Sequence, residues 1–189
     1  RVNSLSDDPL AAGENVLLLN QMQQDDSFTQ SSGAVTGQLQ VADSALGQVV
    51  SQLTQAISLA TAANNGTMNA NDRASIGNQL AGIRSEVLGL ANSSYQGQYI
   101  FGGGQTGNVP FALNTGVAPA AVVYSGGSGS GAVNYLETPN GQRIQMNVPG
   151  DQIFSGPGSN SVFGALNKLI ADYSSGNTDS SQAVSDTTA

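Results

Sequence analysis

The side chains that could perform chemistry are few, because the chain contains no histidine and no cysteine. The commonest general base and the thiolate metal ligands are therefore missing, which leaves carboxylates as candidates. Within residues 100–155 the carboxylates are Glu137 and Asp151, and neither has an acidic neighbour in the sequence. The sequence therefore predicts no catalytic residue, no metal site and no cofactor, and so no enzyme.

A glycine-rich pattern, GxGxxG, spans residues 102–107 and is a further candidate for a ligand site. In dinucleotide-binding proteins this pattern opens a helix whose N-terminus holds the pyrophosphate. Here Asn108, Val109 and Pro110 follow the pattern, and they do not begin a helix. We therefore predict that no dinucleotide binds at these glycines.

Charged residues are few and mostly acidic, which argues against nucleic-acid and membrane partners. Charged residues make up 10% of the 189 residues and the net charge is −8, whereas a usual soluble domain is roughly 25% charged. A phosphate-binding groove needs clustered cations, and the five basic residues are scattered: Arg1, Arg73, Arg84, Arg143 and Lys168. The pattern predicts no nucleic-acid partner and no membrane partner, and no apolar run approaches the roughly 18 residues of a membrane span.

The elements that would position any functional residue are long helices. Between Val35 and Ala63, apolar residues recur at alternating steps of four and three, which is typical of a helix packed lengthwise on another helix. After Asn64, Asn65 and Gly66, the same spacing returns from Ile76 to Leu90, so the two segments predict an antiparallel helical hairpin. Asn69 or Asn71 is expected to cap this second helix, and Gly97 is expected to end it. The expected packing seam is Leu39, Leu46, Val49, Leu53, Leu80, Ile83, Val87 and Leu90. An ordinary amphipathic helix in a globular core is the alternative.

The first helix is expected to begin at Pro9 and, if unbroken, to form a rod ending at Ala63. Asp8 followed by proline is a helix-start signal, and acids there complement the helix dipole. Two interpretations of the glycines at 33 and 37 remain equal, namely close approach of another helix or a loose joint. The charged rod end also predicts a subunit interface, with capping as the alternative role: Arg1, Asn3, Asp7 and Asp8.

Residues 100–155 change to a β-like pattern. Strand-like runs flank Pro139–Gly141, which predicts a hairpin, and the aromatic residues are expected to be core: Tyr99, Phe101, Phe111, Tyr124, Tyr135 and Phe154. A third helix is expected from Asn160 to Gly176. The predicted fold class is α+β, with a helical rod formed by residues 1–99 and 156–189 and an inserted antiparallel β domain at 100–155.

Several segments resemble the flagellin family. Residues 1–14 read RVNSLSDDPLAAGE, which is similar to the family signature, and residues 41–53 read VADSALGQVVSQL, which is similar to the helix that follows. Residues 90–104, LANSSYQGQYIFGGG, and 149–154, PGDQIF, resemble the hook-associated members of the family more than the filament members. The likeness covers residues 1 to about 104 well and residues 145 to 175 moderately.

The resemblance implies a structural protein of the bacterial flagellum that joins hook to filament and supports motility. It implies export through the flagellar type III apparatus with a chaperone, an extracellular location, and contacts with further copies in a ring, with flagellin and with another hook-associated protein. The chain begins at Arg1, so we expect a fragment, monomeric because the family's polymerising terminal helices are missing. Filament flagellin and a secreted adhesin, binding a host glycan or protein through the β insert, are the alternatives.

Overall fold

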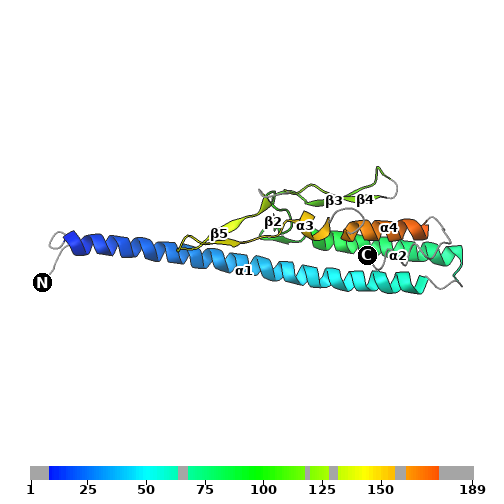
Figure 1. Cartoon of the computed structure of the whole chain (residues 1–189), viewed down its shortest axis with the longest axis horizontal. Helices are drawn as coiled ribbons and strands as arrows, with labels where there is room; N and C mark the ends of the chain where they lie inside the picture. Colours follow the sequence, from blue (N-terminus) through cyan, green and yellow to red (C-terminus); the bar gives the residue numbers. More distant parts are fainter. Residues whose placement is uncertain (1–8, 64–67, 118–119, 128–131, 156–160, 175–189) are drawn as a thin grey trace.

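The computed structural model describes residues 9–63, 68–117, 120–127, 132–155 and 161–174. Figure 1 shows an elongated molecule in which one helix, α1, runs along the whole length. Two further helices, α2 and α4, lie beside its C-terminal half, and the strands lie on the other side of α2 and above the middle of α1. The α+β fold class with a long helical hairpin is therefore confirmed.

Helix α1 runs unbroken from Pro9 to Ala63, 55 residues, so the glycines at 33 and 37 do not interrupt it. At 1.5 Å per residue it is about 80 Å long, longer than a compact domain of this size. Val35 is the first buried apolar residue along the described chain. Residues 9–34, which we call the arm, therefore precede the part of α1 that packs in the helical core.

Helix α2, Ala70–Ala91, begins with a complete capping box. The backbone N–H of Asp72 donates to Asn69 Oδ1 over 2.9 Å, and the N–H of Asn69 donates to Asp72 Oδ2 over 3.4 Å. This satisfies backbone donors that a helix start otherwise leaves free. The helix returns antiparallel to α1 (Figure 1) and buries Ile76, Leu80, Ile83 and Val87.

The α1 face that packs on the body is formed mainly by small residues: Ala45, Val49, Ala56, Ala60 and Ala63. This differs from the predicted seam, because Leu39 is 49% exposed, while Leu46, Leu53 and Leu90 are only partly buried. A straight helix with 3.6 residues per turn drifts away from a 3.5-residue repeat, and alanines let the helix backbones come close. The larger leucines consequently lie at the edge of the contact.

The third predicted helix is present as α4, Val162–Ser174, and α2 lies between it and α1. Its buried face consists of Phe163, Leu166, Leu169, Ile170 and Tyr173. The Tyr173 hydroxyl also reaches past α2 and donates to the Ala60 carbonyl over 2.9 Å. This bond joins the last helix to the C-terminal end of α1.

The strands form three separate antiparallel pairs. They are β1 (Ser94–Tyr95) with β2 (Gln98–Tyr99), β3 (Phe111–Asn114) with β4 (Ala121–Tyr124), and β5 (Tyr135–Glu137) with β6 (Arg143–Gln145). The predicted hairpin around Pro139–Gly141 is confirmed by the last pair. A short helix, α3 (Gly150–Phe154), follows it and was not expected.

The first hairpin corrects one prediction. Gly97 does not end α2, which ends at Ala91 with Asn92 as its C-cap. Instead Gln96 and Gly97 have positive φ angles, 50° and 79°, and form the turn between β1 and β2. Positive φ at both central residues is typical of the type I′ turns that connect tight hairpins.

Four of the phenylalanines join the strands to the helices in a single cluster. The Phe154 ring centroid lies 5.3 Å from those of Phe101 and Phe111 and 5.8 Å from that of Phe163 on α4. The cluster is continuous with Leu80 on α2, so the division at residues 100 and 155 stays a prediction. Tyr135 is 53% exposed, so its predicted core position is wrong. It lies in the β5–β6 pair, and a sheet of two strands buries few of its own side chains.

Tyr173 gives a prediction about alkaline pH. Burial raises the pKa of Tyr173 above its ordinary 10.0, and the charge of Asp172 adds to the rise, opposed by Arg73. As the pH increases, the unfolded chain therefore loses the phenol proton first, so stability is complete below about pH 10 and falls above it. Tyr173→Phe should lower the free energy of unfolding at pH 7 by about 1 kcal/mol. As the pH rises, the variant should lose less of its stability than the parent, because it has no phenol at this position to ionise. Thermal unfolding from pH 7 to pH 11 measures both effects, and parallel curves for the two proteins would contradict this assignment.

Candidate assembly surface

The residues with catalytic or metal-binding potential are not brought together. Glu137 on β5 pairs in register with Arg143 on β6, whereas Asp151 lies on α3. Among the described residues, no group of three or more His, Cys, Asp or Glu side chains could hold a metal ion. The glycine pattern at 102–107 leads through turns to β3, and no helix opens after it.

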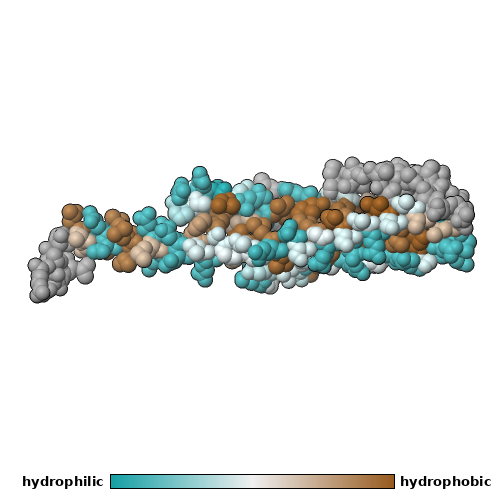
Figure 2. Space-filling model, turned by 90° about the horizontal axis from the view of Figure 1, so that it is seen from below, coloured by the Kyte–Doolittle hydropathy of each residue, from teal (hydrophilic) through white to brown (hydrophobic). Residues whose placement is uncertain are grey.

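The predicted subunit interface at Arg1, Asn3, Asp7 and Asp8 lies outside the described residues. The first described feature of the rod is instead a set of large apolar side chains on the arm, each more than half exposed: Leu10, Val16, Leu17, Leu18, Leu19 and Met22. Figure 2 shows apolar patches on the exposed part of the arm. Monomeric soluble proteins rarely expose apolar patches of this kind unless the patch binds something.

One face of α1 continues this exposure along the body. Leu39, Val50 and Ile57 are 49%, 63% and 48% exposed. They are separated by about three and two helical turns, so they share a face, and the same periodicity places Leu17 and Leu10 in line with them. We call these five residues the apolar stripe: Leu10, Leu17, Leu39, Val50 and Ile57.

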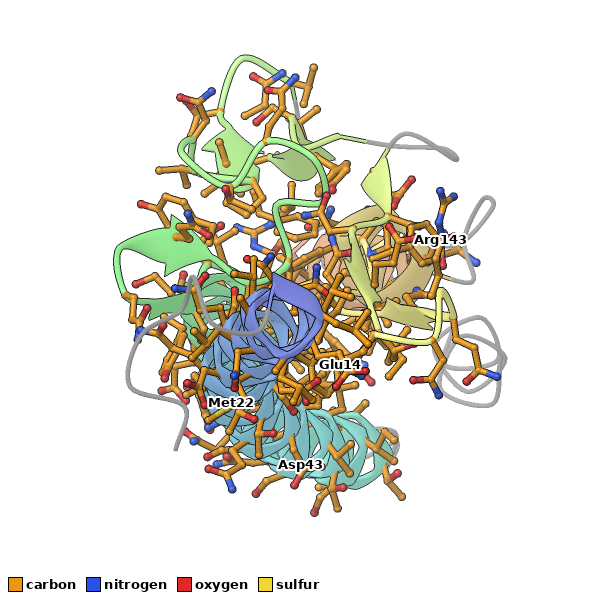
Figure 3. The ribbon with its side chains drawn as sticks, turned by 90° about the vertical axis from the view of Figure 1, so that its left-hand side faces the viewer. Glu14, Met22, Asp43 and Arg143 are labelled. Atoms are coloured by element: carbon orange, nitrogen blue, oxygen red, sulfur yellow. The ribbon has the colours of Figure 1, made fainter. Side chains whose placement is uncertain are left out.

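Helix α1 itself contributes only acidic charges beside the apolar stripe. Helix α1 contains Glu14, Asp25, Asp26 and Asp43, and it contains no lysine or arginine. Helical periodicity places Glu14, Asp25 and Asp43 along one edge of the stripe. Seen along the rod in Figure 3, Asp43 lies on the side of α1 remote from Arg143. The stripe therefore has an anionic border.

The β5–β6 hairpin lies over the arm and forms a groove of about 790 Å³ with it. Its walls combine apolar side chains, Leu17, Phe28 and Leu136, with amides such as Asn20 and Gln24. The hairpin thus covers one side of the arm only. The apolar stripe touches this groove at Leu17.

This arrangement offers a packing surface. A long helix with an exposed apolar face gains free energy when another helix covers it. None of the helices among the described residues combines the length and the apolarity needed to cross a bilayer. The sequence indicated the heptad spacing, but it could not tell which α1 face the body covers and which it leaves open.

Comparison with known proteins places this geometry among flagellar proteins. Residues 1–106 match the family of the bacterial flagellin N-terminal helical region. Flagellar hook-associated protein 3 of Escherichia coli strain K12 is 32% identical over 163 residues, which cover 86% of this chain and 49% of that protein. The chain therefore spans about half the length of the curated relatives that it matches.

Solved structures agree with this similarity. The crystal structure of Xanthomonas campestris FlgL matches 72% of this chain and 41% of its own, with a TM-score of 0.61 and 27% sequence identity. Bacillus cereus FlgL covers 94% of this chain and 84% of its own with a TM-score of 0.68; at 20% identity this likeness concerns the fold alone.

Proposed function

Because this chain belongs to the family of the bacterial flagellin N-terminal helical region, we propose that it is a structural component of the bacterial flagellum that joins hook to filament. Support for the junction role, rather than the filament role, comes from the similarity to flagellar hook-associated protein 3. That similarity covers 86% of the chain and so includes part of the region after residue 106. No feature of the described residues favours a filament flagellin or an adhesin over this role.

The observation that carries the proposal is the uncovered apolar stripe on a rod about 80 Å long. Covering one leucine-sized side chain contributes about 1.5–3 kcal/mol, so the stripe can drive helix packing in an assembly. The anionic border favours partner helices with lysine or arginine beside their apolar seam. The partners would be further copies, flagellin, another hook-associated protein and, before export, a chaperone.

The remaining features have supporting roles in this proposal. Residues 1–99 with 156–189 form the rod, and residues 100–155 form a β insert that stiffens it through the phenylalanine cluster. Arg1, Asn3, Asp7 and Asp8 contribute a subunit contact at the rod end. The protein acts outside the cell, on the flagellum, and it acts by packing and not by catalysis.

Deletion of the gene tests the proposed function directly. We expect hooks without filaments in electron micrographs, flagellin released into the medium, and loss of swimming, all restored by the intact gene on a plasmid. Normal filaments in the deletion strain would rule out the junction role. Turnover of peptide or glycan substrates that is lost on Glu137→Gln would contradict the absence of catalysis.

A further inference from the structure

One close contact lies where the arm leaves the body. The ring of Tyr95, in strand β1, rests on α1 at Gly37. A Cβ atom at Gly37 would overlap the Tyr95 hydroxyl and would lie 2.9 Å from Cζ and 3.3 Å from Cε2 of the ring. Gly33, one turn away on the same helix, has nothing within 4 Å of its position for a Cβ. The missing side chain of Gly37 therefore leaves space for the Tyr95 ring, and we call this space the Gly37 notch. Gly33 makes no such contact.

Tyr95 is held by a hairpin that is anchored to the body. The Asn92 side chain donates to the Phe111 carbonyl over 2.9 Å and accepts from the Phe111 N–H over 3.0 Å. The Ile100 N–H donates to the Ser93 carbonyl over 3.0 Å, which closes the base of the β1–β2 hairpin. Since Ile100 and Phe111 are buried in the core, the hairpin presents Tyr95 to α1 from a fixed position.

The contact lies at the boundary of the packed region. Val35 is the first buried apolar residue of the described chain, and every apolar residue of Leu10–Met22 named above is exposed. Two hollows adjoin Tyr95, one lined by Gly37 and Leu90 and the other by Val35 and Met146. Tyr95 thus fills the space between α1 and the end of α2 at the base of the arm.

We infer that Tyr95 is a positioning residue, and that its ring in the Gly37 notch sets the direction in which the arm leaves the body. Glycine in a helix interior is less favourable than alanine, so replacing a glycine that only weakened the helix would stabilise the protein. At Gly37 the overlap with Tyr95 opposes that gain, and the arm or the hairpin has to move. That the direction of the arm matters for assembly rests on the proposed function, whereas the contact between Tyr95 and Gly37 does not depend on it.

The chain has no cysteine, so pairs of spin labels can be introduced without background. Labels at Met22→Cys on the arm and Glu86→Cys on α2 report the arm-to-body distance by electron–electron dipolar spectroscopy. We expect Gly37→Ala to shift the distance maximum by several ångströms or to broaden the distribution. The matched control Gly33→Ala should keep the parent distribution and raise the melting temperature.

Substitutions at Tyr95 complete the test. Tyr95→Ala should broaden the distribution, and adding Gly37→Ala to it should cause no further change, whereas Tyr95→Phe should restore the parent distribution because it keeps the ring. Circular dichroism confirms that each variant stays helical, and if Gly37→Ala fails to fold, the Tyr95 variants carry the test. An unchanged distribution in Tyr95→Ala would overturn the inference and leave the proposed function standing. Normal filaments after gene deletion would overturn the proposed function and leave the inference about Tyr95 standing.

Discussion

Phe154→Ala is expected to lower the free energy of unfolding by about 3–5 kcal/mol. The Phe154 side chain is fully buried and its ring meets three other phenylalanines, contributed by the segment after β2, by β3 and by α4. Alanine would leave a cavity at the point where the β region joins the helices, and the surrounding elements cannot collapse into it without breaking their own contacts. Denaturant unfolding followed by circular dichroism measures the loss.

Tyr135→Ala is the matched control, because it also removes an aromatic ring from the β region but from an exposed position. We expect it to change stability by less than about 0.5 kcal/mol. A loss for Phe154→Ala as small as that of the control would mean that the phenylalanine cluster does not hold the two regions together.

The double variant Leu10→Gln and Leu17→Gln is expected to abolish assembly without unfolding the protein. Both side chains are at least 70% exposed, so their replacement should leave the unfolding free energy within about 0.5 kcal/mol of the parent. Each removes an apolar group from the part of the stripe on the arm, where a partner helix would bury it. Filament formation in the deletion strain and the melting temperature of the purified protein separate the two effects.

Asn15→Ala with Gln30→Ala is the control for this variant. Helical periodicity places both residues off the apolar stripe, and both are exposed on the arm. Filaments should form normally with these changes. Loss of filaments in the control as well would show that any change on the arm is harmful and that the stripe has no special part.

The helices and one hairpin could be predicted because their signals are local. Heptad spacing, a capping asparagine at residue 69 or 71 and the Pro139–Gly141 turn each act within a few residues, so sequence alone located α1, α2 and the β5–β6 turn. The structure then selects Asn69 as the cap of α2. The exposure of Leu39 and Tyr135 could not be predicted, because it depends on which distant elements arrive to cover them. Tertiary packing also decided that Gly97 belongs to a hairpin and not to the end of α2.

The buried polar contacts were also beyond prediction. The Nη1 atom of Arg84 donates to the Ala120 carbonyl over 2.7 Å and to Asn167 Oδ1 over 2.8 Å. These two bonds join α2 to the residue preceding β4 and to α4. Burial lowers the pKa of Arg84. These partners are 36 and 83 residues away in the chain, and a lone arginine on an amphipathic helix gives no sign of them.

The candidate site was predictable only in kind. Low charge and the absence of histidine and cysteine led us to expect packing rather than catalysis, and that expectation stays a prediction. The structure adds the particular face of α1 that stays open. The interface at Arg1, Asn3, Asp7 and Asp8 remains a prediction, since it lies outside the described residues.

Electron microscopy of the deletion strain producing the Leu10→Gln and Leu17→Gln protein is the most direct test of the role assigned to the apolar stripe. We predict bare hooks and flagellin in the medium, although the variant is folded and exported at the parent level. Filaments of normal number and length on those cells would contradict the claim that helix packing along α1 joins this protein to its neighbours.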